Sequence, residues 1–312
     1  MPDYPGQQHY PASSEIDAWA GELWKLADAT ACEGGTLTDA VNRFPFGVRH
    51  QKGTAYIKFV PDGPEPLEPF HGLWQPAPSG PAPLLVHVPG YGAEMSAHPE
   101  LVSQGFNVLH VNPLGYATPQ GPDESKKRDG SWPVLPDTIR SLGRAGYRHW
   151  LTDVLLAARW AQAQPSVLPD RVSFFGTSQG GGTALLLGSL FNDRGARCVA
   201  ADVPFLTHFP MVYAEREKGA YALAEKALAE AGSEAAAWRA VGAIDTMNHV
   251  HRLNLPVLLT AGEKDGVCTP KSIEALFHKL PGTRSYTLIQ NQAHDYTRTF
   301  LYLAAAWFRL WA

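Results

Sequence analysis

RVSFFGTSQGGG, residues 171 to 182, places a glycine two residues before and two residues after Ser178, directly behind a short apolar run. The apolar run is typical of a buried strand, and residues 179–191 after it are typical of a helix. A serine in the pattern G-x-S-x-G at such a strand-to-helix turn is typical of an exposed nucleophile. Glycines are needed there because side chains at those positions would collide with neighbouring backbone. The stretch therefore predicts that Ser178 is a nucleophile at the carboxyl edge of a sheet.

Apolar runs of strand length recur on both sides of this turn and alternate with helix-like stretches. The runs are LLVHVP (84–89), FNVLHVN (106–112), CVAADV (198–203), PVLLTAG (256–262) and SYTLIQ (285–290). The helix-like stretches include residues 147–164, 179–191 and 270–280. Strands that are apolar throughout and alternate with helices form a parallel sheet covered on both faces. TAYIKFV (54–60) and FHGLWQ (70–75) predict paired antiparallel strands at the N-terminal edge, so we expect an α/β-hydrolase fold with a mostly parallel central sheet.

Length and composition indicate one large domain. The 312 residues are 45% hydrophobic and 18% charged, enough to bury a sizeable core. We expect an N-terminal helical extension over residues 1–50, with a helix from Ser13 or Ser14 to about Ala29, and the hydrolase domain over residues 51–312. Within that domain, residues 204–250 are rich in alanine and charge and predict helices. These helices could form a cap over the active site or belong to the ordinary surface.

The segment from Tyr116 to Arg140 is long and mixed in composition. We interpret it as a loop, either a solvated connection or one that contacts the substrate.

The charge of the chain indicates what kind of partner it binds, and its cysteines indicate the cellular compartment. The 30 acidic and 26 basic residues give a formal charge of −4 without a long block of one sign, which argues against nucleic-acid binding and favours a small, neutral or weakly charged partner. The cysteines, Cys32, Cys198 and Cys268, are odd in number and widely spaced, which argues against a disulfide framework or a paired zinc site. We therefore expect a reducing compartment and a cytoplasmic protein.

No membrane association is expected from the sequence. Residues 1–19 lack the basic start and apolar core of a secretory signal. The segment TFLYLAAAWFRLWA (299–312) is the most apolar, but Arg309 interrupts it, so it predicts a buried terminal helix.

A serine nucleophile needs a base within hydrogen-bond reach and a carboxylate that orients the base. In this fold the acid follows the serine along the chain, and the histidine follows the acid. Asp265 comes after the strand PVLLTAG, and His294 comes after the strand SYTLIQ, so both lie where strands end at the edge that carries Ser178. Glu263 and Asp295 are the competing acids.

Other chemically active side chains have simpler interpretations. His87 and His110 lie inside predicted strands, so we interpret them as core residues satisfied by local hydrogen bonds. His249 and His251 could hold a metal in principle, but no third ligand lies near them in the sequence. Cys268 is interpreted as a small packing residue.

The tetrahedral intermediate of acyl transfer needs two donors to its oxyanion. The backbone N–H of Gln179, which follows the nucleophile at a helix start, should be one. The second should come from the loop PGYGAE (89–94) after the strand LLVHVP, with Tyr91 preferred and Gly92 as the alternative.

Three segments resemble the acetyl xylan esterase and cephalosporin C deacetylase group, carbohydrate esterase family seven. They are GTSQGGG (176–182), ADVPFLTHF (201–209) and LNLPVLLTAGEKDGVCTP (253–270), and FHGLWQP and LLVHVPGYG extend the resemblance to about residue 50. The resemblance implies a triad of Ser178, Asp265 and His294 and oxyanion donors at Tyr91 and Gln179, with no metal or organic cofactor. It also implies acetyl esters of sugars or cephalosporins as substrates and assembly into homo-oligomers.

Some positions depart from that family. PLGYATP (113–119) stands where its members usually have arginine, glycine and glutamine, and VCTP (267–270) stands where they tend to have CPP. The first fifty residues do not resemble the family.

The expected function is a serine carboxylesterase that hydrolyses small acyl esters, such as acetyl groups on sugars or xylo-oligosaccharides. The alternatives are a serine peptidase or another α/β-hydrolase with a different ester or amide substrate. A protein that binds a small molecule without turnover is a third hypothesis.

Overall fold

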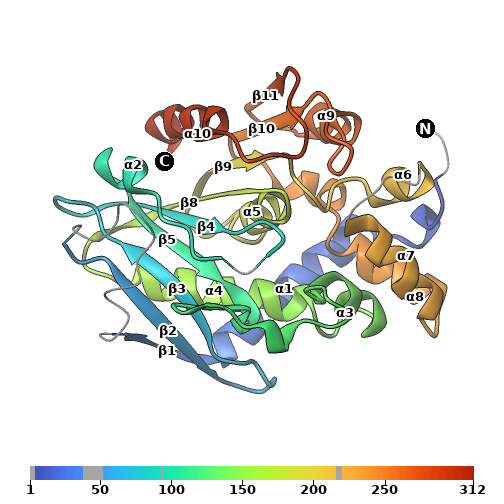
Figure 1. Cartoon of the computed structure of the whole chain (residues 1–312), viewed down its shortest axis with the longest axis horizontal. Helices are drawn as coiled ribbons and strands as arrows, with labels where there is room; N and C mark the ends of the chain where they lie inside the picture. Colours follow the sequence, from blue (N-terminus) through green and yellow to red (C-terminus); the bar gives the residue numbers. More distant parts are fainter. Residues whose placement is uncertain (1–3, 38–51, 93, 216–219) are drawn as a thin grey trace.

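The computed structural model describes residues 4–37, 52–92, 94–215 and 220–312. Over these residues the chain forms a nine-stranded sheet (Figure 1). In spatial order its strands are β1 (Ala31–Thr36), β2 (Ala55–Asp62), β3 (Phe70–Gln75), β5 (Asn107–Asn112), β4 (Ala82–Val88), β8 (Val167–Thr177), β9 (Ala196–Asp202), β10 (Val257–Gly262) and β11 (Arg284–Ile289). The six strands from β5 to β11 are parallel, whereas β1, β2 and β3 pair antiparallel. The predicted fold class is confirmed.

Helices cover both faces of the sheet because the parallel strands are apolar on both faces. Phe174 and Phe175 are both fully buried, and they belong to different core clusters because successive side chains of β8 point to opposite faces. Figure 1 shows α2 (Pro99–Ser103) and α10 (Arg298–Trp311) on one side of the sheet, with α1 (Ser13–Ala29) and α4 (Tyr147–Gln162) on the other. The side of α1 and α4 also includes α5 (Gln179–Leu190) and α9 (Pro270–Lys279) in its core.

The N-terminal segment contributes more than the helix predicted for it. The short helix η1 (Gln7–His9) precedes α1, and α1 has the predicted bounds and packs against α4. The indole Nε1 of Trp24 donates a hydrogen bond to the Leu190 carbonyl oxygen at the end of α5 (2.8 Å). Residues 31–36 then add β1 to the edge of the sheet, a strand that the glycine-containing sequence ACEGGT did not indicate. The expected boundary between residues 50 and 51 lies outside the described residues.

The segment from Tyr116 to Arg140 is not the open loop that its composition suggested. After η3 (Pro113–Gly115) it forms the small hairpin of β6 (Ala117–Thr118) and β7 (Gly121–Pro122), then η4 (Glu124–Lys126) and α3 (Val134–Arg140). Trp132 stacks on Tyr116 with a centroid distance of 4.8 Å, and both side chains are buried. Tertiary contacts of these aromatic rings order the segment, and such contacts leave no period in the sequence.

Most of the described residues between 204 and 250 are helical, as predicted. They form α6 (Phe209–Ala214), α7 (Ala220–Glu230), α8 (Glu234–Gly242) and η5 (Thr246–Arg252), and residues 216–219 lie outside the described part. Figure 1 shows α6, α7 and α8 together at one end of the molecule, and α7 and α8 pack against α3. A role as a cap stays a prediction.

The apolar C-terminal segment forms α10, whose buried residues include Phe300 and Phe308, as the sequence predicted. Among the described helices, none combines the length and hydropathy that a membrane span requires.

Candidate active site

Ser178 lies at the turn between β8 and α5. Its backbone has φ 57° and ψ −118°, a left-handed conformation that a residue with a side chain rarely adopts. Hydrogen bonds hold it there: Ser178 N donates to the Asp202 carbonyl oxygen (2.9 Å), and the Ser178 carbonyl oxygen accepts from Phe205 N (2.9 Å) and Gly182 N (3.0 Å). The contacts of β9 and of the segment after it thus offset the backbone strain at the turn.

The glycines around Ser178 are required by close backbone contacts. A Cβ atom at Gly176 would lie 2.5 Å from the Gly180 carbonyl carbon, and one at Gly180 would lie 2.1 Å from the Val88 carbonyl oxygen. Both distances are far inside van der Waals contact, so β8, α5 and the end of β4 meet here with no space for a side chain. The steric reason predicted from the sequence is confirmed.

Asp265 and His294 lie in loops that follow adjacent strands, Asp265 after β10 and His294 after β11. The structure brings both residues to Ser178. His294 Nε2 lies 3.0 Å from Ser178 Oγ, and His294 Nδ1 lies 2.8 Å from Asp265 Oδ2. The imidazole therefore bridges the hydroxyl and the carboxylate within hydrogen-bond distance on both sides.

The Asp265 side chain is buried, and its second oxygen is also occupied. Asp265 Oδ1 accepts hydrogen bonds from the backbone N–H groups of Val267 and Cys268, both at 2.8 Å. These two donors fix the carboxylate, so that Oδ2 faces the imidazole. The sequence VCTP thus contributes backbone amides, and the Cys268 side chain packs in the core as predicted.

The competing acids do not reach His294. Glu263 Oε2 accepts a hydrogen bond from Asn291 N (2.8 Å), and Asp295 is exposed.

The two predicted oxyanion donors belong to segments beside Ser178. Gln179 is the first residue of α5, where backbone N–H groups have no partner within the helix. Tyr91 follows β4, and its hydroxyl accepts from Trp132 N (2.9 Å) and donates to the Trp132 carbonyl oxygen (3.3 Å). Sequence reasoning missed Trp132, which anchors this loop to the segment before α3. Gly92, the alternative donor, adopts a φ of 154°.

Asp202 is a second residue that sequence reasoning did not single out, although it lies in the quoted segment ADVPFLTHF. Its carboxylate accepts hydrogen bonds from the hydroxyls of Thr177 (3.0 Å) and Thr260, so it links β8, β9 and β10 beneath the active site. Burial raises the pKa of Asp202 to about 6 because the charged form is poorly solvated there.

The four other histidines that the sequence singled out form two pairs. His249 contacts Ser189 Oγ and the Ala243 carbonyl oxygen, both at 2.9 Å, whereas His251 contacts Asp17, so the pair does not converge on one point. Burial lowers the pKa of His249 to about 4. His87 Nδ1 and His110 Nδ1 lie 2.7 Å apart in the sheet, which agrees with buried histidines that satisfy each other locally.

The sequence and the fold are both similar to those of known acetyl xylan esterases. The profile of the family described as acetyl xylan esterase (AXE1) matches residues 72–310. The fold is similar to acetyl xylan esterase 1 from Thermoanaerobacterium sp. JW/SL YS485 (TM-score 0.76, 21% identity, 99% of this chain and 98% of that chain). It is also similar to the acetyl xylan esterase from Paenibacillus sp. R4 (TM-score 0.75, 21% identity, 100% of both chains). Est1E from Butyrivibrio proteoclasticus is more distant (TM-score 0.52, 15% identity, 83% of this chain and 98% of that chain).

Proposed function

The chain belongs to the acetyl xylan esterase (AXE1) family, and we propose that it removes acetyl groups from xylan or xylo-oligosaccharides through a covalent acyl-enzyme. It is a serine ester hydrolase. The observation that carries the proposed mechanism is the pair of contacts that His294 makes, to Ser178 Oγ at 3.0 Å and to Asp265 Oδ2 at 2.8 Å.

In the proposed first step, Ser178 Oγ attacks the acetyl carbonyl carbon while His294 Nε2 accepts the hydroxyl proton. The tetrahedral intermediate collapses as His294 returns the proton to the departing sugar oxygen, leaving an acetyl group on Ser178. Water then attacks this ester with His294 as the base, the bond to Ser178 Oγ breaks as His294 returns the proton to Oγ, and acetate is released. Asp265 accepts the Nδ1–H hydrogen bond throughout, so it stabilises the imidazolium form of His294.

Negative charge develops on the carbonyl oxygen in both tetrahedral intermediates. We assign the backbone N–H groups of Gln179 and Tyr91 as its donors. The Gln179 donor lies at the start of α5, where the helix dipole also favours negative charge. The Tyr91 donor depends on a loop that the tyrosine hydroxyl ties to Trp132.

The compartment and assembly belong to the same proposal. Cys32, Cys198 and Cys268 form no disulfide, and burial raises the pKa of Cys32 and Cys198 to about 12, which keeps them as thiols. The two buried, unreactive thiols of Cys32 and Cys198 support a cytoplasmic enzyme. The family resemblance also predicts a homo-oligomer, which light scattering of the purified protein would test.

We also propose that α6, α7 and α8 cap the active site.

The test of function is the initial rate of hydrolysis of p-nitrophenyl acetate, butyrate and octanoate by wild type and Ser178→Ala. We expect acetate to be the fastest of the three esters, and the variant to lose at least about 10³-fold in kcat. Acetylated xylo-oligosaccharides and cephalosporin C are the next substrates. If the wild type leaves all three esters unchanged, or hydrolyses an aminoacyl arylamide faster than the acetate, the esterase proposal is wrong.

A further inference from the structure

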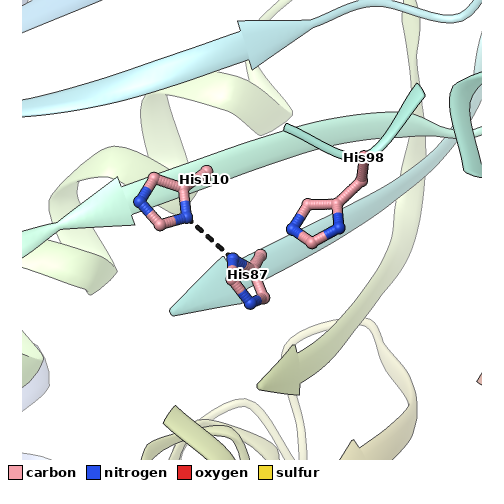
Figure 2. A group of neighbouring side chains, drawn as sticks. All are labelled: His87, His98 and His110. Atoms are coloured by element: carbon pink, nitrogen blue, oxygen red, sulfur yellow. Dashed lines mark hydrogen bonds between the residues drawn. The ribbon is translucent and has the colours of Figure 1, made fainter. Parts of the chain in front are cut away.

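Three buried histidines converge at a point that the proposed reaction does not use. His87 lies on β4, His110 lies on the neighbouring strand β5, and His98 immediately precedes α2 (Figure 2). Their exposed fractions are 7%, 0% and 6%. One ring nitrogen from each histidine lies within 4.8 Å of the corresponding nitrogens of the other two.

The tautomers of His87 and His110 follow from their contacts. His110 Nε2 lies 2.9 Å from the Glu94 carbonyl oxygen, which can only accept, so Nε2 carries a proton. In a neutral ring, His110 Nδ1 then has a free lone pair. His87 Nδ1 lies 2.7 Å from this nitrogen and donates to it. The two Nδ1 atoms share a single proton, which belongs to His87. A metal ion could take its place between them if this proton moved to Nε2 of His87.

His98 supplies the third nitrogen. Neither of its ring nitrogens has a hydrogen-bond partner among the described residues, although both are buried. Its Nδ1 lies 3.9 Å from Glu100 Oε1, and the other ring nitrogen, Nε2, is directed toward His87 and His110 (Figure 2). The backbone is held in place because His98 N donates to Gln75 Oε1 (2.8 Å). A buried ring with two unsatisfied nitrogens is costly unless something binds it.

We propose that His87, His98 and His110 bind one divalent transition-metal ion of the type that prefers imidazole ligands, with Zn²⁺ as the first candidate. This proposal departs from the sequence-based expectation of no metal. The surroundings of the rings also match those of metal ligands, whose second nitrogen typically donates to a backbone carbonyl or a carboxylate. The Glu94 carbonyl oxygen has this position for His110. The Glu100 carboxylate, 3.9 Å from His98 Nδ1, would take it for His98 after a small approach.

The geometry requires only small movements. Ligand nitrogens about 2.0–2.1 Å from a tetrahedral Zn²⁺ ion are roughly 3.4 Å apart. The His87 and His110 nitrogens, now 2.7 Å apart, would separate slightly, and His98 would move inward from within 4.8 Å.

The ion would join both ends of one functional loop. His87 is the second-last residue of β4, and His98 is the residue before α2, so the segment between them contains Tyr91. His110 already binds the middle of this segment through the Glu94 carbonyl oxygen, which also accepts from Asn112 Nδ2 (3.1 Å). The metal would therefore be structural, and it would order the loop that carries the proposed oxyanion donor.

The test begins with wild-type protein stripped by a chelator and titrated with Co²⁺ and then Zn²⁺. We expect one ion per chain, visible absorption typical of tetrahedral Co²⁺, and loss of that absorption when Zn²⁺ displaces it. Free Zn²⁺ at about 100 times its Kd should raise Tm by roughly 4 °C. His98→Ala should weaken binding by more than about 100-fold, and Glu100→Gln by about 10-fold.

His278→Ala is the matched control, because His278 is an exposed histidine on α9 outside this cluster. It should bind Co²⁺ like wild type. Equal binding by His98→Ala and wild type, or no binding by wild type, would overturn the proposal. If circular dichroism shows that His98→Ala does not fold, X-ray absorption spectroscopy of Zn²⁺-loaded wild type tests the proposal instead. We expect three imidazole ligands around the ion, and fewer than three would contradict the proposal.

Discussion

At the scale of single residues, the Asp265 carboxylate has a defined task for each oxygen. Oδ1 accepts from two backbone N–H groups, and Oδ2 faces His294 Nδ1. This division fixes which tautomer of His294 the site favours, because a carboxylate can only accept. With Nδ1 protonated, Nε2 has the lone pair that the proposed mechanism needs to take the Ser178 proton.

Asp265→Asn should therefore retain the fold and lose activity. Backbone donors at Val267 and Cys268 would bind the new amide oxygen, which leaves the amide NH₂ facing His294 Nδ1. The imidazole would then carry its proton on Nε2 and could no longer accept one from Ser178. We expect kcat for p-nitrophenyl acetate to fall by about 10⁴-fold with Tm nearly unchanged. An activity within tenfold of wild type would show that Asp265 does not orient the base.

At the scale of elements, α1 and β1 join the N-terminal segment to the hydrolase fold. Leu23, Ile16 and Ala27 on α1 are fully buried, while the whole of β1 pairs with residues 57–62 of β2. His251 and Arg252 of η5 also contact Asp17 of α1, with the arginine at 2.6 Å. α1 and β1 are therefore packed into the hydrolase fold.

Leu23→Ala should lower the free energy of unfolding by about 2–5 kcal/mol. The Leu23 side chain is 0% exposed, so its truncation leaves a buried cavity. Urea denaturation measures the change. Glu22→Ala, at the exposed neighbouring position, is the control and should stay within about 0.5 kcal/mol of wild type. Esterase activity per folded molecule should be the same in both variants. If both variants have wild-type stability, α1 does not contribute to the cooperative core.

At the scale of the whole molecule, the buried carboxyl of Asp202 links global stability to pH. Its pKa in the folded protein is about 6, above the ordinary value of 3.8, because burial disfavours the charge. Well below pH 3.8 the group is protonated in both states. As the pH rises toward 6, the carboxyl loses its proton in the unfolded chain before it does so in the folded protein. Ionisation therefore favours the unfolded chain and lowers the free energy of unfolding. Above pH 6 the loss is complete and amounts to up to about 3 kcal/mol.

Asp202→Asn should remove this pH-dependent loss. The amide keeps an acceptor for one threonine hydroxyl, and the other hydroxyl can rotate to accept from the NH₂ group. Free energies of unfolding measured between pH 4 and 7 should show the wild type falling relative to the variant by up to about 3 kcal/mol. Parallel curves for the two proteins would mean that Asp202 titrates normally.

The sequence by itself determined most of the fold, because apolar runs and helical spacing are local properties of the chain. It also indicated the residues that meet at Ser178, since parallel strands bring their carboxyl ends to one edge, and Asp265 and His294 each follow such a strand. The glycines at positions 176 and 180 were informative because backbone contacts at the turn leave no space for side chains.

Only the tertiary structure decided the features that depend on contacts between distant segments. Asp265 and Glu263 are two residues apart, and the backbone donors at Val267 and Cys268 direct only Asp265 to the imidazole. Residues 116–140 adopt a defined structure because Tyr116 and Trp132 stack on each other in the core. His98 meets His87 and His110 because β4, β5 and the start of α2 converge in space, and no local pattern in the sequence records that convergence.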